Sequence, residues 1–220
     1  MLKAYTHFCD ALFESYGYEK AVHMLAKRVS KVEYLSCQSV IGVDTESRPS
    51  FVKGTHYPTA LLQMATEDRC YLFRLNRIGL PQSITDLFSN PKICKIGLAF
   101  KDDINGLRRL RNFVARNCID LQQIVGQYGI LDLGLQKIHA ICFGQKISKS
   151  QQLTNWENEI LTIEQARYAS TDAWSTLLIY KELKQTSPLS RKEVEQIYME
   201  DKERQLKELA EHDNSNSTSK

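Results

Sequence analysis

The apolar residues at the start of the chain recur every three or four positions, which is the spacing of one face of a helix. They are Leu2, Tyr5, Phe8, Cys9, Leu12 and Tyr16. This pattern predicts an amphipathic helix in an N-terminal extension, residues 1–24.

Three short runs of apolar and β-branched residues come next, in the stretches SVIGV, TALLQMAT and RCYLFRLN. Runs of this length and composition are typical of β-strands. The polar turn 67–69 separates the last two, and the connections between all three are short. Because strands with short connections tend to pair as neighbours, the runs predict an antiparallel meander.

Helical and extended patterns alternate through the middle of the chain. The stretches PQSITDLFSN, DDINGLRRLRNF and LGLQKIHAICFG are predicted helices, the last with Gly144 as its C-cap, while ICKIGLAF and the start of NCIDLQQI are predicted strands. Thr162 and Gln165 form a T-x-x-Q capping box that opens a long helix, IEQARYASTDAWSTLLIYKEL. This order predicts one α/β domain over residues 25–188, with a mixed sheet of five or six strands flanked by helices.

The end of the chain, from residue 189, is rich in charged and polar residues. Residues 189–212 are highly charged and predict a helix with only a narrow apolar stripe. That stripe favours docking on the domain, with a protein partner as the alternative. The last eight residues, 213–220, are polar and of low complexity, which predicts a disordered tail.

The composition is that of a globular protein with a hydrophobic core. With 220 residues, 42% hydrophobic and 25% charged, the chain can bury a core without a disulfide or metal staple. Its six cysteines form no CxxC pair and mostly have apolar neighbours, which indicates reduced thiols. No signal peptide and no apolar run of membrane-spanning length is present, so we expect a cytoplasmic protein with no membrane contact. The net charge of +3 is compatible with a nucleic-acid partner.

Candidate chemistry begins with the stretch IGVDTES, in which Asp44 and Glu46 follow a buried strand. Residues two apart on a strand point to the same face, so the two carboxylates are expected side by side. Taken alone, such a pair is more often a solvated strand end. The pair indicates a functional site only if further acids lie beside it.

Asp102 and Asp103 follow the strand ICKIGLAF. Asp103 shares a helix face with Leu107 and Leu110, so we expect it to point toward the end of the sheet. Asp102 falls on the opposite, solvent-facing side. We therefore assign Asp102 the role of helix N-cap, the usual role of aspartate at that position.

The stretch RYASTDAW supplies the last acid. Tyr168 and Asp172 are four residues apart on one helix and therefore face the same way. Three elements thus carry four acids that can meet at one edge of the sheet, with no lysine or arginine interleaved. Mg²⁺ and Mn²⁺ prefer carboxylate oxygens, so divalent ions are the natural means of neutralising this cluster. The five histidines are scattered without ligand spacing, which disfavours zinc.

Together these motifs resemble a known family. VDTE, the G-x5-D of GLAFKDD and the Y-x3-D of YASTD are similar to the three motifs of the DEDDy 3′→5′ exonucleases, in the RNase H-like or DnaQ-like superfamily. The similarity is greatest to the Werner-type exonuclease domain, a relative of RNase D, and extends over about residues 25–185. It implies an RNase H-like fold and a nuclease that acts on DNA, or on RNA, with a role in DNA repair.

The resemblance also implies a role for each motif residue. Asp44, Glu46, Asp103 and Asp172 would bind two divalent metal ions, Mg²⁺ or Mn²⁺. Tyr168 would orient the attacking water, which one ion activates, while the other stabilises the leaving 3′-oxygen. Hydrolysis would release nucleoside 5′-monophosphates from the 3′ end.

Further residues are candidates for contact with the substrate. Thr45 and Ser47, within and directly after the D-x-E, would lie beside the terminal nucleotide. Lys149, in a loop before Trp156, and Arg108, in a basic run, would bind the phosphate backbone, although Arg108 on a solvated helix face is an equal alternative. Trp156 itself is interpreted as a packing residue. The sequence departs from close Werner-type relatives at Asn105, where they carry an aromatic residue that could stack on a base.

Two hypotheses other than an enzyme are also consistent with the sequence. One is a catalytically silent nucleic-acid-binding module of the same fold. The other is a scaffold that acts through its terminal helices. Four intact acids argue against the first, since a silent descendant has no physical reason to keep carboxylates that repel one another.

Overall fold

The computed structural model of the chain describes residues 31–217. The helix expected within residues 1–24 lies outside this range. No helix in the described range combines the length and apolar character needed to cross a bilayer. Five cysteines in this range are free thiols, and the cytoplasmic location stays a prediction.

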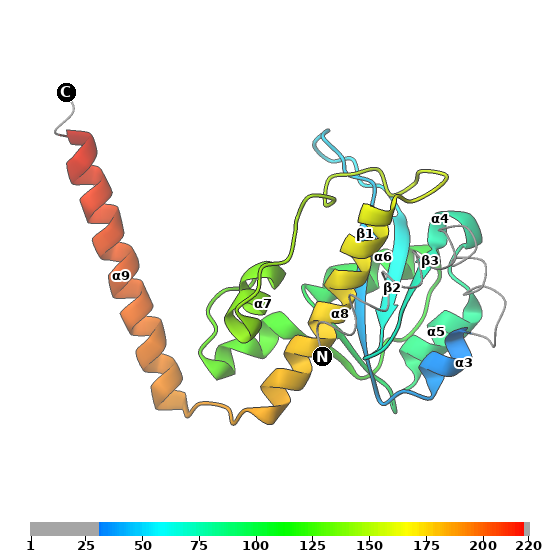
Figure 1. The fold of residues 1–220 in the computed structure, drawn as a ribbon, viewed down its shortest axis with the longest axis horizontal. Helices are drawn as coiled ribbons and strands as arrows, with labels where there is room; N and C mark the ends of the chain where they lie inside the picture. Colours follow the sequence, from blue (N-terminus) through cyan, green and yellow to red (C-terminus); the bar gives the residue numbers. More distant parts are fainter. Residues whose placement is uncertain (1–30, 218–220) are drawn as a thin grey trace.

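A five-stranded sheet forms the centre of the molecule (Figure 1). Its strands are β1 (Val40–Ser47), β2 (Thr59–Ala65), β3 (Cys70–Arg74), β4 (Cys94–Gly97) and β5 (Cys118–Asp120). Across the sheet the order is β3-β2-β1-β4-β5. The first three strands form an antiparallel meander, and β4 and β5 run parallel to β1. The meander and the mixed sheet predicted from the sequence are both confirmed.

Helices cover both faces of this sheet (Figure 1). They are α3 (Lys31–Ser36), α4 (Leu75–Ile78), α5 (Gln82–Ser89), α6 (Phe100–Leu110), α7 (Leu135–Phe143), α8 (Ile163–Gln185) and α9 (Arg191–Ser217), with two short 3₁₀ helices, η1 (Leu121–Gln123) and η2 (Val125–Tyr128). The capping box at Thr162 and Gln165 and the C-cap at Gly144 are present as predicted.

The period of two along β1 divides its side chains between two layers. Ile41 and Val43 belong to the core cluster that contains residues of α3, α5 and α6. On the opposite face, Gly42, Asp44 and Glu46 lie toward the long helix α8. The polar end of β1 pairs with β2 and extends past β4, so its side chains are half-buried.

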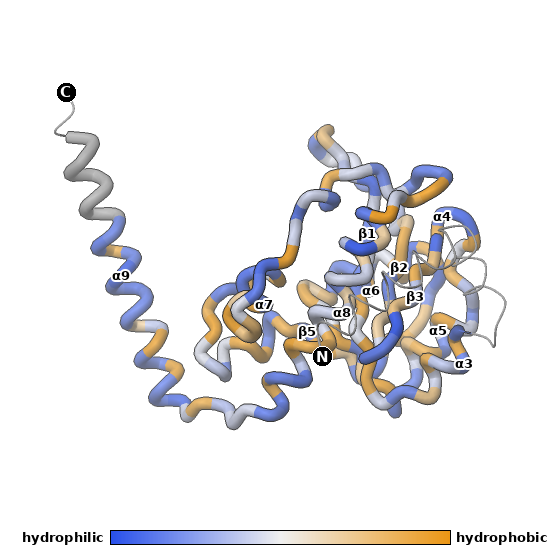
Figure 2. The backbone as a smooth tube through the Cα atoms, in the orientation of Figure 1, coloured by the Kyte–Doolittle hydropathy of each residue, from blue (hydrophilic) through white to orange (hydrophobic). Residues whose placement is uncertain are grey.

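Helix α9 begins close to the domain and then leaves it (Figure 1). Its first turns lie against η2, where Ile197 approaches Gly129 and the Tyr198 hydroxyl approaches Gly126. Figure 2 shows a mostly hydrophilic helix beyond that contact. The alternative for this helix, a protein partner, stays a prediction.

The tail expected at 213–220 begins as helix, because α9 continues to Ser217. The helix thus extends into the segment expected as a tail, and the disorder of that tail stays a prediction. Helix extension is cooperative, so an established helix continues over polar residues that would not start one. Residues 218–220 lie outside the described range.

Candidate active site

The site depends on a close approach between β1 and α8 at Gly42. A Cβ placed there would come within 2.0 Å of the Ala173 carbonyl oxygen and 2.9 Å of Thr176 Oγ1. Only glycine lets the helix backbone lie this close to the strand. The approach brings Asp172, the residue next to Ala173 on α8, over the end of β1.

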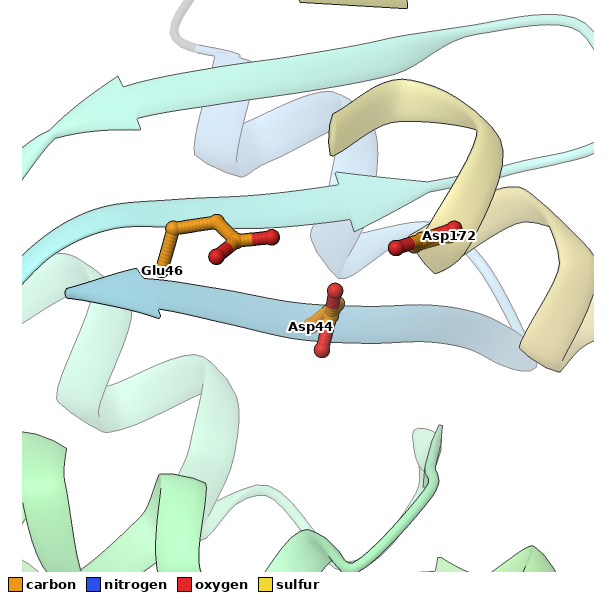
Figure 3. A group of neighbouring side chains, drawn as sticks. All are labelled: Asp44, Glu46 and Asp172. Atoms are coloured by element: carbon orange, nitrogen blue, oxygen red, sulfur yellow. The ribbon is translucent and has the colours of Figure 1, made fainter. Parts of the chain in front are cut away.

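Three carboxylates meet at this point. Asp44 and Glu46 project from β1 and Asp172 projects from α8, as Figure 3 shows. Each offers an oxygen that lies within 4.8 Å of the others. The alternation along the strand and the helical spacing therefore bring these acids together as the sequence indicates.

Asp103 joins the group from the other side of β1. Its Oδ1 accepts a hydrogen bond of 2.5 Å from the Thr45 hydroxyl. The negative charge of Asp103 also helps to raise the pKa of both Asp44 and Glu46. Thr45 thus contacts an acid of the cluster and orients it.

The assignment of Asp102 as the cap of this helix is wrong. Helix α6 begins two residues earlier, at Phe100, so Asp102 lies within the first turn, with an exposed side chain. The Asp120 carboxylate at the end of β5 instead accepts from the backbone N–H groups of Ala99 and Phe100, at 3.0 and 2.9 Å. Ala99 has a φ of 52°, an uncommon value for a residue with a side chain.

Asp120 was not identified from the sequence as part of the site. It stabilises the tight turn between β4 and α6, and that turn directs Asp103 toward Thr45. The only signal in the sequence is an aspartate at the end of a predicted strand. Such a residue reveals its partner only when the strands are placed side by side.

Burial raises the pKa values of the four carboxyl groups in the cluster, and mutual repulsion adds to the effect at Asp44 and Glu46. Burial raises the pKa of Asp44 well above its usual range, and the charges of Asp103, Glu46 and Asp172 add to the effect. Burial, followed by repulsion from Asp172 and Asp103, raises the pKa of Glu46 to about 9. Burial likewise raises the pKa of Asp103 and of Asp172 to about 7. A bound cation would stabilise the ionised form of all four groups.

Tyr168 lies one helical turn before Asp172 and its hydroxyl is hydrogen-bonded to that carboxylate. Its ring packs at 6.0 Å from the ring of Trp156, which is fully buried, as the packing interpretation of that residue requires. Burial and the neighbouring carboxylates raise the pKa of the phenol far above its usual value. The hydroxyl therefore keeps its proton at neutral pH and can act as a hydrogen-bond donor.

Two loops flank the acids. Lys149, in the loop between α7 and α8, is close enough to Asp172 for its ammonium to lower the pKa of that carboxyl. The same loop meets the β1–β2 loop through an ion pair of 3.7 Å between Arg48 and Glu157. Phe51, in the β1–β2 loop, is 83% exposed. The sequence analysis did not single out this aromatic residue.

Ser47 and Arg108 are the remaining candidates for contact with the substrate. Ser47 follows the acids on β1, where the register with β2 shifts between Glu46 and Ser47. Arg108 lies near the far end of α6, where its Nε donates to the Phe113 carbonyl at 3.3 Å. Its guanidinium also lies over the Phe113 ring. Ser47 is thus the residue next to Glu46 on β1, and Arg108 contacts Phe113 in the segment that follows α6.

The donor set fits a hard divalent cation. Oxygen ligands from several carboxylates, partly buried and mutually repelling, are the environment that Mg²⁺ and Mn²⁺ prefer. Of the cationic groups described, Lys149 is the one whose charge lowers the pKa of a carboxyl in the cluster. One ammonium leaves most of the negative charge uncompensated.

Comparisons with known proteins agree with this geometry. A family model described as 3′-5′ exonuclease matches residues 18–187. Exonuclease 3′-5′ domain-containing protein 2 of Mus musculus is 31% identical over 156 residues, which cover 66% of this chain and 24% of that protein. The bifunctional 3′-5′ exonuclease/ATP-dependent helicase WRN of Mus musculus is 28% identical over 155 residues, 68% of this chain and 11% of that protein. The chain therefore spans a quarter or less of the length of these two relatives.

Solved structures share the fold. The EXO domain of Aedes aegypti Nibbler matches with a TM-score of 0.63 and 22% identity, over 80% of this chain and 91% of that one. RNase D of Escherichia coli, described as an exoribonuclease involved in structured RNA processing, matches with a TM-score of 0.62 and 22% identity. That match covers 74% of this chain and 42% of the other. The mixed sheet with flanking helices is thus an RNase H-like exonuclease fold.

Proposed function

The chain belongs to the 3′-5′ exonuclease family, and from this premise we propose that it hydrolyses phosphodiester bonds from the 3′ end of a nucleic acid. The observation that carries the proposal is the convergence of Asp44, Glu46 and Asp172, whose oxygens lie within 4.8 Å of one another. Asp103 completes the group through Thr45. Retaining four repelling acids in one place is costly unless they bind a cation.

Two divalent ions, Mg²⁺ or Mn²⁺, are the proposed cofactors, held by these four acids. When bound, such ions lower the pKa of water and stabilise the charge that develops on a phosphodiester. The acids bind them in their ionised form. Their raised pKa values, about 7 for Asp103 and Asp172 and about 9 for Glu46, make metal binding increase with pH.

Tyr168 is proposed to hold the attacking water by hydrogen bonding. Its phenol does not serve as the base, because its pKa is raised far above the neutral range. The contact between its hydroxyl and Asp172 gives the water a defined place next to the acids. Packing against Trp156 limits the movement of the ring.

Residues of the flanking loops are proposed to hold the substrate. Lys149 would neutralise a backbone phosphate close to Asp172, and Ser47 would contact the terminal nucleotide. Phe51 offers an exposed aromatic face on which an unpaired base can stack. Such contacts suit a single-stranded 3′ end, since an unpaired base exposes its faces.

DNA is the substrate that the motif resemblance favours, whereas RNase D of Escherichia coli, which shares the fold, is an exoribonuclease. The test therefore presents 5′-labelled DNA and RNA oligomers, each as a single strand and with a recessed 3′ end. Incubation with Mg²⁺ or Mn²⁺ is expected to give a ladder that shortens from the 3′ end. EDTA is expected to abolish the ladder.

Neighbouring aspartates provide a matched control. Asp103→Asn is expected to remove activity, while Asp102→Asn, at the exposed position next to it, is expected to retain it. Intact oligomer with the wild type, accompanied by measurable binding, would favour the catalytically silent module instead. Equal activity in the two variants would remove Asp103 from the mechanism.

A further inference from the structure

Gln63 of β2 is a buried amide without a hydrogen-bond partner. Its exposure is 0%. Neither its Nε2 nor its Oε1 has a partner within residues 31–217. Buried amides nearly always have partners, because an unpaired donor or acceptor has lost its contact with water and gained nothing in return. The position of this amide relative to the acids gives a reason for its retention.

The register of the sheet places Gln63 directly opposite Asp44. Residues opposite one another in an antiparallel pair project to the same face, with their Cβ atoms about 4.5–5.5 Å apart. Figure 3 shows β2 running alongside β1 next to Asp44. A glutamine side chain is long enough to reach a carboxylate across that separation.

Helix α8 covers the face on which Gln63 lies. Leu61, two residues before Gln63, clusters with Ala169. Ala65, two residues after it, clusters with Ala173. The amide is therefore enclosed under the part of α8 that carries Asp172, with the acids as its nearest polar neighbours along β1.

The chemistry of an amide suits this place. A carboxylate that gives one oxygen to a metal ion needs a donor for its other oxygen, and such outer contacts orient the ligand. A lysine would bring a positive charge that competes with the metal. A neutral N–H group orients the carboxylate without that competition.

We propose that Gln63 is a positioning residue for the metal-binding acids, donating from Nε2 to Asp44 when that carboxylate is ionised around a divalent ion. The inference rests on the proposed function, since it assumes that the acids bind metal. It predicts that Gln63 contributes to metal affinity and does not contribute to the stability of the metal-free fold.

The experiment compares Gln63→Leu with His139→Leu. His139 is a matched control, because it is 1% exposed, its two ring nitrogens also lack partners among the described residues, and it lies on α7 beside Phe143. The dissociation constant for Mn²⁺ is measured by titration calorimetry, and the Tm of the metal-free proteins by scanning calorimetry. Gln63→Leu is expected to weaken Mn²⁺ binding by about 10-fold or more while keeping or raising the metal-free Tm. His139→Leu is expected to bind Mn²⁺ as the wild type does.

Other outcomes overturn the proposal and say where it fails. Mn²⁺ binding by Gln63→Leu that equals the wild type removes Gln63 from the site and leaves the proposed function standing. A wild type that binds no Mn²⁺ removes both. If Gln63→Leu does not fold, Gln63→Met, which keeps an unbranched side chain of similar length, is measured in its place against the same expectations.

Discussion

Gly42 on β1 and Ala173 on α8 lie so close together that a Cβ on the glycine would come within 2.0 Å of the alanine carbonyl oxygen. This contact sets the height of α8 above the sheet. Asp172 is the residue next to Ala173, so the same contact sets the position of one acid relative to Asp44 and Glu46. The geometry of the site therefore depends on a residue with no functional group.

Gly42→Ala should push α8 away from β1. Replacing glycine by alanine within a strand normally stabilises it by roughly 0.5–1 kcal/mol. Here the clash is with backbone, which cannot rotate away, so we expect a loss of roughly 1–3 kcal/mol in the free energy of unfolding. Urea unfolding measures it, and exonuclease activity should fall with it.

Gly134→Ala is the control for this change, because no atom lies within 4 Å of its added Cβ. At that helix N-cap position we expect a cost of about 1 kcal/mol or less, with activity retained. A Gly42→Ala protein as stable and active as the wild type would show that α8 can move without affecting the acids.

The metal-free protein should become less stable as pH rises. Folding raises the pKa of Asp103 and Asp172 to about 7 and of Glu46 to about 9. The folded state thus holds protons that the unfolded chain has already released above pH of about 4, so the free energy of unfolding falls between that pH and about 9. Scanning calorimetry in EDTA should show a Tm lower by roughly 5 °C at pH 9 than at pH 5.

Added Mn²⁺ should reverse this trend, stabilising the protein more at pH 9 than at pH 5, because it binds the ionised carboxylates. Asp44→Asn removes one of the repelling charges and should flatten the decline in EDTA. A metal-free Tm that rises toward pH 9 would mean that the four acids are already compensated in the folded protein.

Tyr168→Phe should separate metal binding from turnover. The substitution keeps the ring that packs against Trp156 and removes the hydroxyl that is hydrogen-bonded to Asp172. We expect Mn²⁺ affinity close to that of the wild type and a fall in kcat of roughly 10²-fold. Titration calorimetry and a single-turnover cleavage assay provide the two measurements.

Tyr180→Phe serves as the comparison, since Tyr180 is on the same helix and its hydroxyl interacts with Cys94 instead of the acids. Its kcat should match the wild type. If Tyr168→Phe also turns over at the wild-type rate, Tyr168 has no part in holding the water.

Lys149→Met should weaken nucleic-acid binding in a salt-dependent way. An ammonium that contacts one phosphate contributes about one unit to the slope of log affinity against log salt, and its removal should lower the slope by that amount. Binding of a labelled oligomer is measured at several salt concentrations in an Asp44→Asn background, which prevents cleavage. Lys184→Met, an exposed change in the last turn of α8, should leave the slope as it was. Equal slopes for Lys149→Met and the background protein would place the phosphate elsewhere.

The sequence allowed much of this site to be predicted because each part of it is local. Asp44 and Glu46 share a face because a strand has a period of two, and Tyr168 and Asp172 share a face because they are four apart on a helix. The capping box at Thr162 depends on residues three apart and was predicted for the same reason.

The prediction for Asp102 depended on a contact across the fold and was wrong. Asp102 was assigned a cap that Asp120 provides from a neighbouring strand. Asp120 is far from the start of α6 in the sequence, so periodicity had no means of finding it. Arg108 stays a candidate for phosphate binding, with its guanidinium over the Phe113 ring.

The sequence by itself determined the type of the five strands and of helices α5 to α9, and the direction in which each acid points from its own backbone. The tertiary structure decided how close the acids come, through the contact between Gly42 and Ala173 and the bond between Thr45 and Asp103. It also decided that Gln63 is buried opposite Asp44. The physical reason is that side-chain direction follows from local backbone geometry, whereas the distance between two elements depends on the packing of residues far apart in the chain.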